Sequence, residues 1–248
     1  MRALAVVLTI CTSGVAAQEL TIATGGHYPP YIFDPATPQA TGLDKDLVDE
    51  ICVRGGYTCV WVDLPMDDIF QALARGDVDV VTGGFGYSTE RDAIVDFTCP
   101  YVRGGDDVGT FLAAVEEIDL IEARIGVLVG SLYESALAKA NRATVPFPTE
   151  EAALDALIAG DIDVVFGSQN MQEDAASRGG FFAVGEYPTF SGGSVLGVAE
   201  TAPQLLTDLD ALLAEISADG TLDRLHTKWL GAGDGDVIAR CMDPAALT

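Results

Sequence analysis

The stretch that decides the fold occurs twice: ALARGDVDVVTG at residues 72–83 returns as ALIAGDIDVVFG at residues 156–167. In each copy, a helix with apolar residues at helical spacing ends at a glycine, which suits the position after a helix C-terminus. A short strand then follows, containing Val80-Val81 or Val164-Val165. Because these strands are apolar without alternation, we expect both of their faces to be buried, as in the parallel sheet of an α/β protein.

A strand and a helix precede each copy of the repeat. Residues 20–23 predict a strand and residues 42–53 a helix, and residues 125–140 contain a second such pair. The chain therefore contains two α/β units. In open α/β sheets, ligands bind beyond the carboxyl ends of the strands. Each unit contributes two such ends, which predicts a site between the units at residues 25–28, 83–86, 130–131 and 167–168.

Two segments are expected to link the units. Residues 107–115 and 193–200 are predicted strands that lie between the units in sequence, so they are candidate crossovers. Residues 203–230 are predicted to be helical, with an apolar face and a break at Asp219-Gly220. The expected fold class is α/β, with two lobes joined by a two-strand hinge.

The N-terminus has the features of an export signal. Met1-Arg2 supplies a charge, residues 3–10 are apolar, and small residues precede a cleavage site after Ala17. The apolar segment is too short for a membrane helix, which needs roughly 20 residues. Lipid attachment at Cys11 is the alternative, but Ile10 precedes it where a small residue is expected. The sequence favours a soluble, exported protein.

The composition is strongly acidic. Among 248 residues, 13 are Lys or Arg and 38 are Asp or Glu, and the formal net charge is −25. The electrostatic field of so negative a chain repels nucleic acids and anionic membrane surfaces, so neither is an expected partner. A ligand that is itself an anion would need a concentrated local positive charge.

Four cysteines follow the signal, an even number in a compartment where disulfides persist. Cys52 and Cys59 flank a helix end, so a bridge between them would attach that end to the next strand; Cys99 and Cys241 pair by elimination. The alternative, a metal site, is weak because no C-x-x-C pair is present and only His27 and His226 could assist. We expect no metal and no cofactor.

Several motifs resemble those of the family 3 extracellular solute-binding proteins, the polar amino-acid receptors of ABC import systems. They occur in the family's order and spacing, and they are YPPY at residues 28–31, GLDKDL at 42–47, STER at 88–91, VDFTCPY at 95–101, ADGTL at 218–222 and KWLG at 228–231.

The resemblance implies a periplasmic binding protein-like fold of type II. It implies a discontinuous first lobe at residues 18–106 and 197–248 and a second lobe at residues 107–196. It places Cys99 and Cys241 in the same lobe. A monomer is expected to hold a small-molecule ligand between its lobes, and closure of the lobes is expected to create the surface that the ABC permease recognises. Contact with the membrane would occur only through that permease.

Arg91 is the first candidate ligand-binding residue. A guanidinium group can hold a carboxylate with two hydrogen bonds, and the matching arginine of the family binds the ligand's α-carboxylate. The alternative is an ion pair within the protein, for example with Asp96. Gly84 and Gly86 offer backbone groups where a side chain would block the approach of a ligand, and Phe85 lies between them.

Other candidate residues come from both units. Ser131 follows Gly130 at a predicted helix N-terminus, which favours an anion, although a simple helix cap is equally consistent. Tyr28 matches the aromatic residue that commonly covers the ligand, or it shapes a turn. Met66 stands where many members carry a second aromatic residue, and its flexible thioether indicates a roomier apolar wall.

Two positions depart from the family pattern. Members that bind α-amino acids usually hold the ammonium group with an aspartate where this chain has Ser168, and another frequent carboxylate falls at Gly25. A buried ammonium group without a carboxylate loses a charge-assisted bond. Three alternatives stay open: an acid from another loop, a ligand without an ammonium group, or a cation–π contact with Tyr28, Phe85 or Tyr133.

Two other functions fit the same fold. A secreted enzyme similar to cyclohexadienyl dehydratase would need a pocket acid, but Gly25 and Ser168 are not acids and only His27 could replace them. Motifs of serine hydrolases, P-loop proteins and zinc enzymes are absent from the sequence. An accessory or sensor protein is the other alternative. The sequence favours a receptor without catalytic residues.

Overall fold

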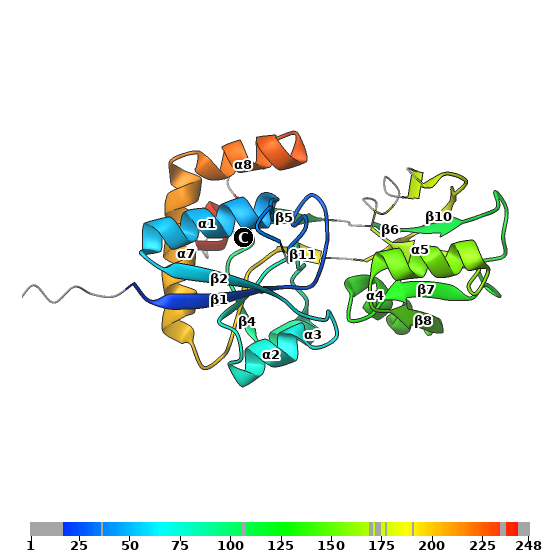
Figure 1. The fold of residues 1–248 in the computed structure, drawn as a ribbon, viewed down its shortest axis with the longest axis horizontal. Coiled ribbons are helices and arrows are strands. Elements are labelled where there is room, and N and C mark those ends of the chain that lie inside the picture. The colour runs from blue at the N-terminus through cyan, green and yellow to red at the C-terminus, as the bar shows by residue number, and fades with distance from the viewer. Residues whose placement is uncertain are drawn as a thin grey trace, which may run out of the picture.

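The protein folds into two lobes that lie side by side along the long axis of the molecule (Figure 1). The computed structural model describes residues 17–35, 37–105, 108–168, 171, 175–176, 178–189, 191–233 and 237–242. Apart from Ala17, the predicted signal at residues 1–17 lies outside these ranges.

A five-stranded sheet of order β2-β1-β3-β12-β4 forms the centre of the first lobe. Strand β1 runs parallel to β2 and β3, whereas β12 runs antiparallel to β3 and β4. The strands are β1 (Glu19–Thr24), β2 (Thr58–Asp63), β3 (Val80–Val81), β4 (Asp96–Phe97) and β12 (Gly197–Val198). The helices are α1 (Leu43–Gly55), α2 (Ile69–Arg75), α3 (Thr89–Asp92), α7 (Pro203–Ala218), α8 (Thr221–Leu230) and α9 (Val237–Met242).

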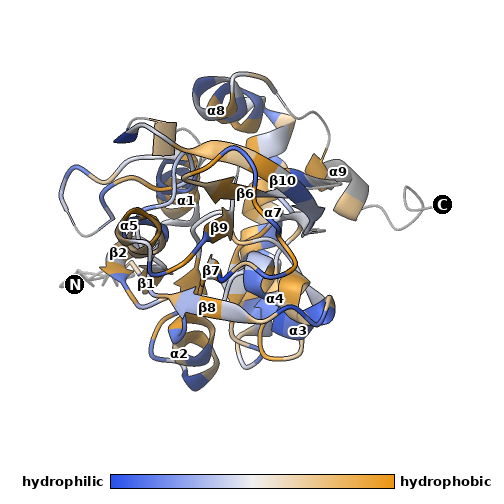
Figure 2. Ribbon diagram, turned by 90° about the vertical axis from the view of Figure 1, so that its right-hand side faces the viewer, coloured by the Kyte–Doolittle hydropathy of each residue, from blue (hydrophilic) through white to orange (hydrophobic). Residues whose placement is uncertain are grey.

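The second lobe contains a sheet of order β10-β6-β9-β7-β8. Strand β7 runs parallel to β8 and β9, and β6 runs antiparallel to β9 and β10. The elements are β6 (Val108–Ala113), β7 (Ile125–Leu128), β8 (Thr144–Phe147), β9 (Val164–Gly167), β10 (Phe182–Pro188), α4 (Leu132–Lys139) and α5 (Glu150–Ala159). The end-on view shows the apolar strands β6, β7 and β9 at the centre of this sheet (Figure 2), and most of their residues are buried.

The repeated stretch forms the same structure in both lobes. Helices α2 and α5 end at Gly76 and Gly160, both left-handed, and the strands that follow are buried on both faces. Each strand pairs in parallel with the first strand of its own unit, which agrees with the parallel α/β arrangement expected from the sequence. Both sheets are mixed rather than purely parallel, because the strands that return from the other lobe run in the opposite direction.

The linking strands agree only in part with the predicted crossovers. Of the predicted segment 193–200, residues 193–194 lie in a linking strand and residues 197–198 form β12 in the first sheet. An antiparallel pair, β5 (Val102–Gly105) and β11 (Ser191–Ser194), lies at the junction of the lobes (Figure 1). The predicted crossover at residues 107–115 is mostly β6, a strand inside the second sheet, buried from Gly109 onward. An apolar crossover and an apolar core strand have the same sequence pattern, which explains the error. The lobe boundaries implied by the resemblance remain predictions.

Both predicted disulfides are present. Cys52–Cys59 joins the last turns of α1 to β2, and Cys99–Cys241 joins the segment after β4 to α9 across 142 residues of sequence. Among the described residues, no helix is long and apolar enough to cross a membrane, and no group of three or more His, Cys, Asp or Glu side chains could hold a metal ion.

The short disulfide gives a testable stability prediction. The Cys52→Ser/Cys59→Ser variant should lose about 2–3 kcal/mol of unfolding free energy, because a small closed loop restrains the unfolded chain only modestly. For a protein of this size, that corresponds to a melting temperature lower by roughly 4–12 °C. Thermal unfolding followed by circular dichroism checks this. A melting temperature equal to that of the wild type would show that the bridge does not stabilise the lobe.

Candidate ligand-binding site

A buried carboxylate fixes the glycine-rich turn after β3. Asp44 is fully buried in the first turn of α1 and accepts hydrogen bonds of 2.7 Å from the Thr82 hydroxyl, from the backbone amides of Gly83 and Gly84, and from the Tyr101 hydroxyl. Burial raises the pKa of the Asp44 carboxyl, and these donors act against that rise. Asp44 therefore sets the position of backbone that was predicted to line the site.

The turn requires glycine at position 84. Gly84 has a φ of +68°, and a Cβ atom there would lie 2.6 Å from the ring of Tyr31 and 3.1 Å from that of Tyr28. Two aromatic rings therefore pack directly against the backbone of the turn. The rings of Tyr28 and Tyr31 are themselves stacked, with centroids 5.9 Å apart.

Arg91 lies in α3, a short helix whose N-cap residue, Ser88, accepts a hydrogen bond from the Arg91 amide. Its guanidinium group packs on the rings of Phe70 and Phe85, at 4.7 and 5.6 Å from their centroids. The whole residue is only 9% exposed. Burial lowers the pKa of Arg91 to about 10, so the group stays charged at neutral pH.

The hydrogen bonds of Arg91 join the two lobes. Its Nη1 donates to the carbonyl of Gly86 at 2.8 Å, and its Nη2 donates to the carbonyl of Gly130 at 3.1 Å. In the part of the chain that the structure describes, the guanidinium group of Arg91 donates to carbonyl groups, and it forms no ion pair with Asp96 or another carboxylate. A buried positive charge thus lies at the lobe boundary with only neutral hydrogen-bond partners.

The second lobe approaches Arg91 through the N-terminus of α4. Ser131 caps this helix by accepting a hydrogen bond from the Glu134 amide at 3.1 Å, while the Gly130 amide donates to the Glu134 carboxylate at 2.8 Å. A Cβ atom on Gly130 would lie 3.2 Å from the carbonyl oxygen of Met66, so the backbones of the two lobes are close here. The capping alternative for Ser131 is therefore observed.

Tyrosines from the two lobes also meet at this boundary. The hydroxyl oxygens of Tyr28 and Tyr133 are 3.5 Å apart. Burial raises the pKa of Tyr28 well above its usual value, and the neighbouring Tyr133 and Glu150 raise it further. Tyr28 therefore remains a neutral hydroxyl at physiological pH.

The space in front of Gly25 is filled by apolar side chains. A Cβ atom on Gly25 would lie 2.8 Å from the sulfur of Met66 and 3.4 Å from the ring of Phe85. Met66 and Phe85 are both buried and belong to the same apolar cluster. An acidic side chain at position 25 would therefore require this packing to change.

Ser168, directly after β9, is 3% exposed and occupied by local hydrogen bonds. Its hydroxyl oxygen accepts from the Met171 amide at 3.1 Å, and its hydroxyl lies 3.5 Å from Oε1 of Glu150. Glu150 was not predicted from the sequence. The signal available was its place in the first turn of α5, which begins at the same edge of the second sheet where β9 ends.

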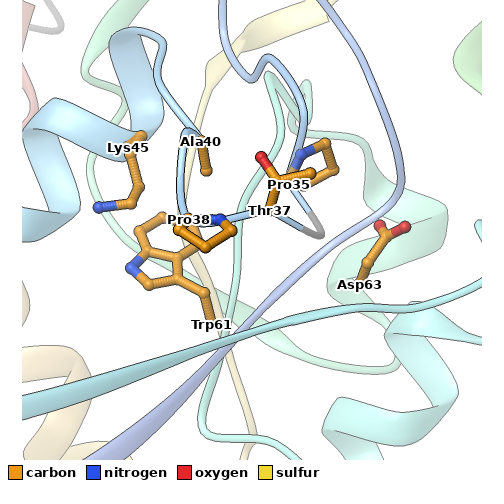
Figure 3. Close-up of a pocket in the computed structure, with 7 residues that line it drawn as sticks. All are labelled: Pro35, Thr37, Pro38, Ala40, Lys45, Trp61 and Asp63. Carbon is orange, nitrogen blue, oxygen red and sulfur yellow. The ribbon is translucent and has the colours of Figure 1, made fainter.

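A separate hollow lies on the first lobe (Figure 3). It is bounded by a loop after β1, by the start of α1 and by β2, and contains none of the residues predicted to bind ligand. Its lining residues are Pro35, Thr37, Pro38, Ala40, Lys45, Trp61 and Asp63. All of them belong to one lobe, so this hollow does not correspond to the predicted site between the lobes.

The predicted residues fall into groups at the lobe boundary. Arg91 contacts Gly86 and Phe85 and also binds the carbonyl of Gly130. Met66 belongs to the same apolar cluster as Phe85, and its backbone lies close to Gly130. Gly84 packs on Tyr28, which reaches Tyr133. Ser131 caps α4 behind Gly130, and Ser168 contacts Glu150.

Known proteins are similar to this chain in sequence. The ABC transporter arginine-binding protein 1 of Escherichia coli K12 is 27% identical over 245 residues, covering 91% of this chain and 97% of that protein. The histidine-binding periplasmic protein of Salmonella typhimurium is 24% identical over 237 residues, covering 86% and 87%.

Solved structures of other binding proteins are also similar to this chain. A periplasmic His/Glu/Gln/Arg/opine family-binding protein from Silicibacter pomeroyi, in complex with lysine, has a TM-score of 0.77 and 30% identity, covering 86% of this chain and 97% of that one. An ancestral arginine-binding protein bound to arginine has a TM-score of 0.74 and 26% identity, covering 87% and 100%. Residues 20–232 match the bacterial extracellular solute-binding proteins, family 3, and the chain belongs to that family.

Proposed function

We propose that this protein binds an amino acid, or a closely related carboxylate, between its two lobes and delivers it to an ABC permease. The single observation that carries the proposal is Arg91, a buried cation held by carbonyl groups of both lobes. Similar proteins named for arginine and histidine binding, and one solved in complex with lysine, support this class of ligand.

The hydrogen-bonding capacity of Arg91 suits a carboxylate. A guanidinium group has five N–H donors in a planar fork, and two of its nitrogens each make one bond to a carbonyl. A ligand carboxylate would use the remaining donors or replace the Gly130 carbonyl as the lobes adjust. The rings of Phe70 and Phe85 hold the guanidinium plane in place, so little side-chain entropy is lost on binding.

The other site residues have supporting roles in the proposal. Tyr28, Met66 and Phe85 form the apolar walls, and the backbone of Gly84 and Gly86 contacts the ligand. Gly130, Ser131 and Ser168 contribute from the second lobe. Residues 1–17 direct export and are removed near Ala17, and the mature monomer works in the periplasm, reaching the membrane only through its permease.

Binding without chemistry is favoured over the dehydratase alternative by the surroundings of His27. This side chain is 55% exposed, lies 3.8 Å from the Asp34 carboxylate and contacts Phe33 edge to face. It thus belongs to a surface turn. Position 25 is a glycine packed against Met66 and Phe85, so it supplies no catalytic acid either.

A thermal-shift screen of residues 18–248 tests the proposal. L-Amino acids, the corresponding 2-oxo acids, dipeptides and ammonium compounds without a carboxylate are compared at matched ionic strength. A ligand at 100 times its Kd adds about 2.7 kcal/mol to the unfolding free energy, which raises the melting temperature by roughly 5–10 °C. Stabilisation by ammonium compounds alone, or turnover of a prephenate-like ring acid with no amino acid bound, would contradict the proposal.

A further inference from the structure

In the proposed function, Arg91 binds the carboxylate of an amino acid. The second lobe contains a candidate partner for the ammonium group of that ligand. Glu150 Oε1 lies 3.5 Å from the Ser168 hydroxyl. It also lies 3.3 Å from the position that a Cβ atom on Gly167 would take. The carboxylate of Glu150 is therefore folded back over the end of β9, at the edge of the sheet where this fold binds ligands.

Local structure directs Glu150 to this edge. Thr149 caps α5 by accepting a hydrogen bond from the Ala152 amide at 3.0 Å, which places Glu150 in the first helical turn. The absence of a side chain on Gly167 leaves room for the Met171 side chain, 2.9 Å from the Cβ position, and for the Glu150 carboxylate. The neighbouring Glu151 points elsewhere: its side chain is 72% exposed and pairs with Arg178 at 3.2 Å. Two adjacent glutamates thus have different surroundings.

Tyr28 connects Glu150 to Arg91. The charge of Glu150 contributes to the raised pKa of Tyr28, although Glu150 belongs to the second lobe and Tyr28 to the first. The interaction with Tyr28 also acts on the pKa of Arg91, opposing the larger effect of burial. The same hydroxyl therefore interacts electrostatically with a positive group from one lobe and a negative group from the other, an arrangement that matches a zwitterion.

Positions 25 and 168, where members of the family frequently carry an acid, supply none in this chain. Position 25 faces the sulfur of Met66, and Ser168 carries no charge. Among the residues that the structure places beside Ser168, Glu150 brings a carboxylate within hydrogen-bonding distance.

We propose that Glu150 is a specificity-determining residue that receives the ammonium group of the ligand, with the Ser168 hydroxyl holding its carboxylate in place. This inference rests on the proposed function and narrows it: the ligands are carboxylates that carry an amine, and their 2-hydroxy analogues bind poorly.

The test compares Glu150→Gln with the wild type by isothermal titration calorimetry. The probes are L-arginine and L-histidine and their 2-hydroxy analogues, argininic acid and imidazolelactic acid. Loss of one charge-assisted bond should weaken binding of the bound amino acid about 30- to 100-fold, and binding of its 2-hydroxy analogue by less than about threefold. Glu151→Gln is the matched control, with the same charge change one residue away, and should bind like the wild type.

A second variant tests the position of the charge rather than its loss. Adding Ser168→Asp to Glu150→Gln returns a carboxylate to the same place, and aspartate can still accept the hydrogen bond from the Met171 amide. Amino-acid affinity should recover to within about tenfold of the wild type. Melting temperatures of all variants are measured alongside, and those of Glu150→Gln and the wild type should agree within a few degrees.

The outcomes separate this inference from the proposed function. If Glu150→Gln binds amino acids as tightly as the wild type, the role of Glu150 is wrong and the receptor function stands. If the wild type binds the 2-hydroxy acids better than the amino acids, the amine requirement is wrong, while the carboxylate site stands. If the wild type binds neither amino acids nor related carboxylates in the thermal-shift screen, the proposed function fails and this inference fails with it.

Discussion

Arg91→Met should weaken amino-acid binding by at least about 100-fold, because methionine fills similar volume between the phenylalanine rings but provides no donor for a carboxylate. Hydrogen bonds to charged groups contribute about 1.5–3 kcal/mol each, and a bidentate pair makes two of them. Calorimetry with the best amino acid from the screen measures the change directly.

Two further variants make this prediction specific. Arg91→Lys keeps the charge but not the fork, and should bind with intermediate affinity. Arg75→Met removes an exposed arginine that pairs with Asp68 and Asp77, and should leave affinity unchanged. If Arg91→Met binds within threefold of the wild type, the ligand carboxylate is held elsewhere.

Asp44→Ala should lower the melting temperature by roughly 6–20 °C. The variant leaves buried donors without an acceptor, including the amides of Gly83 and Gly84, and breaking such a network costs about 3–5 kcal/mol. Ligand affinity should also fall, since the glycine-rich turn loses its anchor. Differential scanning calorimetry, followed by ligand titration below the lowered transition, measures both effects.

Asp49→Ala is the matched control for Asp44→Ala. Asp49 lies in the same helix, but it is half-exposed and forms a surface ion pair with Lys45. Such pairs contribute about 1 kcal/mol or less. A melting temperature for Asp44→Ala as high as that of Asp49→Ala would mean that the turn does not depend on the buried carboxylate.

The sequence was informative about the fold wherever local patterns carry the signal. The repeated helix, glycine and β-branched strand predicted the centre of both sheets, and the positions of Cys52 and Cys59 predicted their bridge. It was not predictable that β6 belongs to the second sheet, because a buried strand has the same apolar pattern in a hinge as in a sheet. Its place is decided by pairing with β9 and β10, which are distant in sequence.

The site residues were likewise predictable where a local motif marks them and not where contacts distant in sequence bring them together. Arg91 is predictable from a local motif, and its ligand contact remains a prediction. Asp44 was visible only as part of a helix start, because its partners lie 38 to 57 residues away and meet it only in the folded lobe. Glu150 was not predictable for a related reason: its approach to Ser168 depends on how α5 packs beside β9.

A crystal structure of residues 18–248 with the best-binding amino acid tests the central claim most directly. We predict the ligand at the boundary between the lobes, with its carboxylate on Arg91 and its ammonium group beside Glu150. A ligand in the hollow beside Trp61 and Lys45, with Arg91 still bonded only to the carbonyls of Gly86 and Gly130, would contradict this account.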